Sequence, residues 1–107
     1  MATWKEFVDG LKDKGGTLAK EELKELVASA KSDGNEFIQR QGTKLERYLA
    51  QLAAGAITVK EFELYTKDLV TLTMMESTAM AQEAQMRAHR LAMKIADLVL
   101  KGLLALL

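Results

Sequence analysis

The chain contains no cysteine and no proline, and only one of its 107 residues is a histidine. The absence of cysteine excludes disulfide bonds, thiolate chemistry and metal ligation by thiolates. The absence of proline removes the residue that most often kinks or ends a helix, so long stretches are free to continue as helix. These absences already favour a helical protein whose function does not depend on cysteine.

The chain also lacks a net charge, because fifteen basic residues balance fifteen acidic ones. A neutral chain offers no broad electrostatic attraction to nucleic acid or to an anionic membrane. Basic residues do recur near the C-terminus, but acidic residues interrupt them and no aromatic residues are interleaved; the basic set is Arg87, Arg90, Lys94 and Lys101. We therefore expect no nucleic-acid partner, and a helical nucleic-acid-binding regulator is the less favoured alternative.

Sequence signals for catalysis or cofactor binding are absent as well. The chain has no glycine-rich phosphate loop and no nucleophile elbow. His89 has no aspartate or glutamate three or four residues away, which a helical metal pair of the di-iron type requires. We expect no catalytic residue, no cofactor and no metal, and hence a protein that is not an enzyme.

The N-terminus and the longest uncharged run argue against secretion and against a membrane span. Lys5, Glu6 and Asp9 stand where a signal peptide needs an apolar core. The longest uncharged run, residues 48–59, has twelve residues, whereas a spanning helix needs about 20. The expected location is the cytoplasm.

The second half of the chain, residues 58–107, is predicted to be one very long helix. Thr58 and Glu61 have the spacing of a capping box, which marks a helix start. Only Gly102 interrupts an otherwise helix-compatible composition. Fifty residues at about 1.5 Å of rise make a rod of about 75 Å, too long to be hidden inside one subunit.

Uncharged residues recur along this predicted helix in alternating steps of four and three. They are Val70, Met74, Ser77, Ala81, Ala84, Ala88, Leu91, Ile95, Leu98, Gly102 and Ala105. A heptad pattern of this length predicts a partner helix alongside, and the small residues in its middle allow a close approach. We interpret this heptad seam as the oligomer interface.

Charge indicates how two copies meet at the seam. Residues 58–83 carry five acidic and two basic residues, whereas residues 84–107 carry one acidic and four basic residues. Antiparallel long helices place each half beside its opposite. The sequence therefore predicts a homo-oligomer, a dimer or higher, whose long helices run antiparallel and cross near Ala81, Ala84 and Ala88.

Two further helices are expected before the long one, over residues 3–14 and over residues 18–54. The second is kinked or broken near residues 33–35, where poor helix formers follow one another. Gly55 suits the position just past its C-terminus. The predicted fold is a single all-α domain over residues 1–107. It is an antiparallel helical hairpin with a very long C-terminal helix and a short N-terminal helix, and it assembles into an oligomeric helical bundle.

The apolar tail over residues 91–107 needs cover, because the first arm of the hairpin reaches only to about Lys94. The N-terminal helix, other subunits or a membrane surface can supply it.

Five methionines are expected mainly in the core, or else in an adaptable groove for a partner helix: Met74, Met75, Met80, Met86 and Met93. We expect a self-assembling scaffold, adaptor or structural subunit; a peripheral membrane protein that inserts its C-terminal helix is the alternative, which the zero net charge does not favour.

Overall fold

The computed structural model describes residues 3–11 and 19–107, and these residues form helices joined by short connections. In chain order the helices are α1 (Trp4–Gly10), α2 (Lys20–Lys31), α3 (Glu36–Ala53), α4 (Val59–Ser77) and α5 (Gln82–Ile95), which continues as the π-helical η1 (Ala96–Leu103) and the 3₁₀ helix η2 (Leu104–Leu106). No strand occurs in the described residues, so the all-α prediction is confirmed. Residues 12–14 of the first predicted helix and residue 18 of the second lie outside the described ranges.

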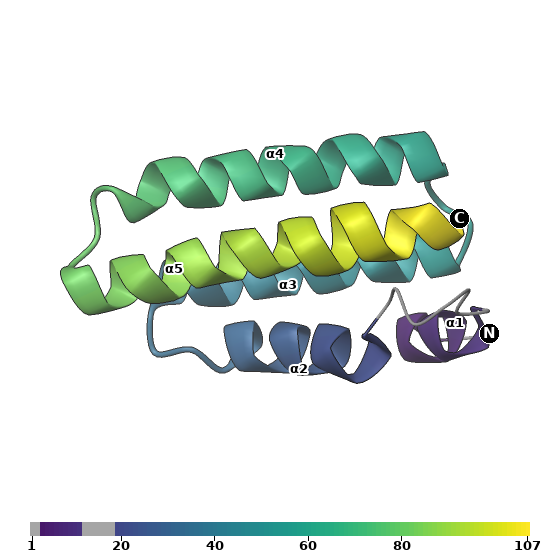
Figure 1. The fold of residues 1–107 in the computed structure, drawn as a ribbon, viewed down its shortest axis with the longest axis horizontal. Coiled ribbons are helices and arrows are strands. Elements are labelled where there is room, and N and C mark those ends of the chain that lie inside the picture. Colours follow the sequence, from purple (N-terminus) through teal and green to yellow (C-terminus); the bar gives the residue numbers. More distant parts are fainter. Residues whose placement is uncertain (1–2, 12–18) are drawn as a thin grey trace.

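The helices are arranged as two antiparallel pairs, α2 with α3 and α4 with α5 (Figure 1). The pairs lie against each other so that α3 neighbours α4, and α2 neighbours α5 and η1. The short α1 lies at the end of the bundle where the C-terminal residues also lie (Figure 1). The result is a four-helix bundle with an additional helix at one end.

The prediction of one continuous helix over residues 58–107 is wrong. The chain leaves the helix after Ser77, reverses through residues 78–81 and returns as α5. The longest dimension of the molecule is 39 Å, about half the length of the predicted rod. Folding back is favourable because it buries the apolar face of α5 against its own chain, so no partner is needed to cover that face.

The second predicted helix breaks near the expected place, but the chain reverses there instead of kinking. Asn35 caps α3, since its Oδ1 accepts hydrogen bonds from the backbone N–H groups of Phe37 and Ile38. The Asp33 carboxylate accepts from the Asn35 N–H at 2.8 Å and holds the turn. The expected single hairpin is therefore replaced by two.

The connection between α3 and α4 agrees with its sequence signals. Gly55 has a φ of 73°, and its N–H donates to Leu52 O while the Ala56 N–H donates to Gln51 O. These two bonds form a Schellman motif, which uses the left-handed conformation that glycine tolerates. The predicted capping box is confirmed, since Thr58 Oγ1 accepts from the Glu61 N–H at 3.0 Å and Glu61 Oε1 accepts from the Thr58 N–H at 2.9 Å.

Polar contacts hold α1 against the bundle. The Trp4 indole N–H donates to Glu46 of α3 at 3.4 Å. Lys24 of α2 pairs with Asp9 at 2.6 Å, and the resulting hydrogen bond raises the pKa of the Lys24 ammonium. Lys20 donates to a carbonyl at the C-terminal end of α1.

The C-terminal tail is covered within the chain. Val99 and Leu103 of η1 are fully buried, and η1 packs against α4 and α2. Trp4 and Val8 of α1 belong to the same apolar core as these two residues. The expected overhang beyond Lys94 does not form, because the chain reverses within each of the two predicted arms, residues 18–54 and residues 58–107.

Candidate functional site

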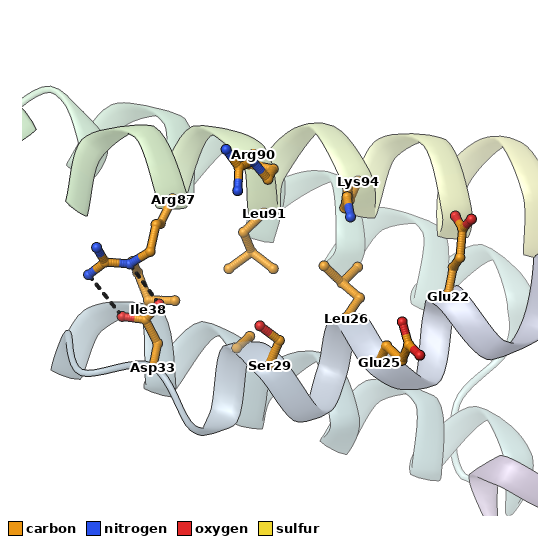
Figure 2. Close-up of a pocket in the computed structure, with 11 residues that line it drawn as sticks. Glu22, Glu25, Leu26, Ser29, Asp33, Ile38, Arg87, Arg90, Leu91 and Lys94 are labelled. Carbon is orange, nitrogen blue, oxygen red and sulfur yellow. Dashed lines mark hydrogen bonds and ion pairs between the residues drawn. The ribbon is translucent and has the colours of Figure 1, made fainter. Parts of the chain in front are cut away.

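A half-open groove of about 270 Å³ separates α2 from α5 (Figure 2). Its floor is apolar, and Leu26 of α2 and Leu91 of α5 point toward each other across it. Ser29 and Ile38 also line it, and Ile38 lies near the end that carries Asp33 and Arg87 (Figure 2). Ligand pockets usually enclose about 300–1,000 Å³, so this groove is smaller than a typical small-molecule site.

The walls of the groove carry opposite charges. Glu22 and Glu25 line it from α2, and Arg90 and Lys94 line it from α5. None of these four side chains forms an ion pair within the part of the chain that the structure describes. Facing charges of opposite sign that form no ion pair attract each other only weakly across the groove, and salt reduces this attraction further.

One end of the groove is closed by a bidentate ion pair between Asp33 and Arg87 (Figure 2). Arg87 Nε donates to Asp33 Oδ2 at 2.9 Å, and Arg87 Nη2 donates to Asp33 Oδ1 at 3.2 Å. Partial burial works to raise the pKa of the Asp33 carboxyl, but the hydrogen bonds from Arg87 and from the Asn35 N–H outweigh it and lower that pKa. The pair joins the α2–α3 turn to α5.

The structure places most of the predicted heptad seam inside the chain's own bundle. Ser77, Ala88, Leu91, Ile95 and Gly102 are buried; Val70, Met74, Ala84 and Leu98 are half-buried; Ala81 and Ala105 are exposed. Nine of the eleven seam residues are thus buried or half-buried within the single chain. The assignment of the seam to an interface between long helices is corrected, because the chain reverses at residues 78–81 and α5 then packs against α2 and α4 of the same chain.

Exposed apolar side chains gather instead on other positions of the C-terminal half. The eight large ones in the described residues are Val59, Leu64, Tyr65, Leu72, Met75, Met86, Met93 and Leu107. None belongs to α1, α2 or α3. Because a few isolated apolar residues are normal on any surface, this restriction to α4, α5 and the C-terminus is the informative part.

Three of the five exposed apolar residues of α4 share one face. Leu64, Leu72 and Met75 recur at helical spacing, and Asp68 lies between them one turn from Leu64 and one turn from Leu72. Leu64 is 52% exposed and Met75 is 65% exposed. We call these three apolar residues the α4 patch.

On α5 the corresponding feature is built from methionines. Met86 and Met93 are 58% and 50% exposed, and together with Gln85, His89 and Arg90 they line a shallow hollow. The expectation that these two methionines and Met75 lie in the core is therefore wrong; Met74 and Met80 are half-buried. We call Met86 and Met93 the α5 patch.

The two helices differ in charge. Helix α4 carries four acidic and two basic residues, whereas α5 carries one acidic and three basic residues. No ion pair joins α4 to α5 among the described residues, since Arg87 pairs with Asp33 and Lys67 pairs with Glu63 of its own helix. The opposite net charges of the two helices thus remain open to other contacts.

The sequence analysis missed the α4 patch. Neither Leu64 nor Leu72 belongs to the predicted heptad seam, which was drawn along one continuous helix over residues 58–107. A separate helical wheel for residues 59–77 would have shown apolar residues on two faces of α4, of which one bundle can cover only one.

None of the helices in the described ranges is both long enough and apolar enough to cross a membrane. Comparisons of the chain with protein-family models, with curated proteins and with solved structures gave no match.

Proposed function

We propose that this chain is a non-enzymatic structural subunit that self-associates, and that its contact surface consists of the α4 patch and the α5 patch. The observation that carries the proposal is the confinement of all large exposed apolar side chains in the described residues to α4, α5 and the C-terminus. Burial of such side chains is the main source of favourable energy in protein association.

Charge favours a second copy as the occupant, with α4 of one copy against α5 of the other. Two α4 helices facing each other would bring Asp68 and its acidic neighbours together, which is unfavourable. An α4 helix facing α5 brings a net acidic helix against a net basic one. In a symmetric pair the α4–α5 contact occurs twice, so each copy buries both of its patches.

The alternative of membrane insertion by the C-terminal helix has less support. It depended on a wide apolar arc that would otherwise face water. In the structure Val99, Gly102 and Leu103 of that arc are buried in the chain's own core. A helix that inserts at a lipid interface must present such a face outward.

Light scattering on the purified chain tests the proposal. The parent should have at least twice the mass of one chain, and Leu64→Glu combined with Met75→Glu should reduce the mass to one chain without loss of helix by circular dichroism. Ala28→Glu combined with Ala50→Glu is the matched control, because both alanines are exposed on α2 and α3. A parent that is already a single chain, or equal effects of the two variants, would contradict the proposal.

A further inference from the structure

The connection between α4 and α5 lacks every residue that normally stops a helix. Residues 78–81 are Thr, Ala, Met and Ala, with neither glycine nor proline among them. Alanine and methionine are among the best helix formers. The chain therefore reverses direction at a place where local preference favours continuing the helix, which is a conflict between the sequence and the local structure.

The backbone of this connection is already close to helical. Thr78 has φ −65° and ψ −22°, and the N–H groups of Thr78, Ala79 and Met80 donate to carbonyls three residues earlier. Ala81 has φ −59°, which also suits a helix, but its ψ is 150°. Rotation of ψ at Ala81 toward about −42° is one of the changes that would straighten the chain.

The start of α5 is weakly secured. Ala81 is its N-cap residue and makes no side-chain capping hydrogen bond. The Thr58 and Asn35 caps of α4 and α3 do make such bonds. A helix that begins at an alanine gains little from beginning there, so joining α5 to α4 costs few local contacts.

The contacts that α5 would lose on straightening can be restored by a second copy. Its buried face, which includes Ala88, Leu91 and Ile95, packs against α2 and α4. The same face fits the same two helices of another copy. Exchange of an identical element between copies costs little because it re-forms the native contacts, including the Asp33–Arg87 ion pair.

We propose that two copies of this chain exchange α5, with α4 and α5 of each copy joined into one helix through residues 78–81. The two joined helices run antiparallel and cross near the connection. Ala81, exposed in the single-chain form, and Ala84 then lie at the crossing, where small side chains permit close approach. This interaction is separate from the surface contact proposed above, because it exchanges buried faces and leaves the α4 and α5 patches outside.

Pulsed electron paramagnetic resonance distinguishes the two forms. Cysteines introduced for spin labels at the exposed Lys60 and Lys94 would be the only ones in the chain. In a joined helix these positions are about 50 Å apart, since 34 residues separate them. In the single-chain form the two positions lie much closer together, because α5 folds back along α4 and places Lys94 near the end of α4 that carries Lys60. The labelled chain is diluted with unlabelled chain and refolded at high concentration.

The expected result is a dimer fraction with the distance near 50 Å, which Ala81→Pro abolishes. Proline suits the φ of Ala81, and the Ala81 N–H makes no backbone hydrogen bond in the described structure. Inside a joined helix, however, proline should lower the exchange constant about a hundredfold at each of the two connections. Ala81→Ser, which adds a cap without a proline, should lower it less.

A parent that shows only the short distance after refolding would overturn the exchange. A long distance that persists unchanged in Ala81→Pro would overturn the joined helix. After refolding at high concentration, the glutamate variant at Leu64 and Met75 should still show the long distance; purified without that step, it should have the mass of one chain because the surface contact is lost. Failure of the exchange and failure of the proposed surface contact are thereby told apart.

Discussion

Helix α3 approaches α2 closely at Gly42. A Cβ atom added there would lie 2.7 Å from Ala30 Cβ and 2.8 Å from the Lys31 backbone nitrogen. Two of the atoms it would meet are backbone atoms, which cannot move aside as the end of a side chain can. The absence of a side chain at residue 42 therefore sets the spacing of the α2–α3 pair.

Gly42→Ala should lower the free energy of unfolding by about 1–3 kcal/mol, although alanine is the better helix former, because the added methyl group forces α2 and α3 apart. Urea denaturation measures the change. Gly34→Ala is the control: nothing lies within 4 Å of a Cβ at that position, and its effect should stay within about 0.5 kcal/mol. Equal effects of the two substitutions would refute the close approach.

A second residue-scale feature is the buried amide of Gln41. Its Nε2 donates to Thr73 Oγ1 at 2.9 Å, and Thr73 Oγ1 donates to Leu69 O. The Gln41 Oε1 has no hydrogen-bond partner among the described residues. A buried polar group left without a partner costs about 1–3 kcal/mol, so this glutamine weakens the core while it specifies which helices face each other.

A double-mutant cycle should separate these effects. Gln41→Met should leave the free energy of unfolding unchanged or raise it, because it removes the unpaired oxygen while Thr73 keeps its bond to Leu69. Thr73→Val should lower it by about 1–3 kcal/mol, since it leaves the Gln41 amide without its acceptor. In the Gln41→Met background, Thr73→Val should lower the free energy of unfolding by clearly less than it does in the parent. Additive changes in chemical denaturation would show that the two side chains are not coupled.

At the scale of elements, the Asp33–Arg87 pair ties the α2–α3 turn to α5. The folded-state pKa of Asp33 is lowered. The pair therefore contributes its full stability above the ordinary aspartate pKa of about 3.9, and the contribution is lost as the pH falls through the lower folded-state value. Asp33 is mostly covered, which limits the screening that weakens surface pairs.

Asp33→Asn should lower the melting temperature at neutral pH and should have progressively less effect as the pH falls below about 4. Asparagine keeps an oxygen that can accept from the Asn35 N–H, so the substitution mainly removes the charge. Asp9→Asn is the control. Asp9 forms an ion pair too, with Lys24, but its side chain is 54% exposed. A melting-temperature difference between Asp33→Asn and the parent that is the same at all pH values would contradict an electrostatic role.

The elements also show how far the sequence could be read. The capping box at Thr58 and the glycine at residue 55 were predictable, because each satisfies backbone groups within a few residues of itself. The reversals were harder to predict. The helical spacing of apolar residues continues in register on both sides of the break at residues 33–35. At residues 78–81 no glycine or proline stops the helix. Long-range burial decides both places, and periodicity does not contain that information.

The candidate site was predictable to a smaller extent. The heptad pattern located an apolar face correctly but could not tell whether the face packs against its own chain or against another. That choice depends on the reversal after Ser77. The exposure of Leu64 and Met75 can be recognised only when the core is known, because the sequence alone does not show whether an apolar residue is buried in the bundle.

At the scale of the whole molecule, the bundle has one polar half and one half with exposed apolar groups. Helices α2 and α3 expose no large apolar side chains, whereas α4 and α5 expose seven, and the eighth is the C-terminal Leu107. Helix α4 is net acidic and α5 is net basic. This asymmetry is the basis for the proposed contact of α4 with α5 of a second copy.

The most direct test of that contact is a charge exchange between copies. Asp68 lies between Leu64 and Leu72 of the α4 patch, and Arg90 lies beside both methionines of the α5 patch. Two proteins are made in the Ala81→Pro background, which blocks exchange of α5: one carries Asp68→Lys and the other carries Arg90→Glu. A dimer of either variant alone would bring like charges together at both of its α4–α5 contacts. In the mixture every contact again joins opposite charges.

The measurement is the mass of each protein alone and of their equimolar mixture, by light scattering at low salt. The account predicts a single-chain mass for each variant alone and the mass of two chains for the mixture, with the mixed dimer weakening as salt is added. If the mixture stays at the mass of one chain while the Ala81→Pro parent is a dimer, α4 does not face α5 of a second copy.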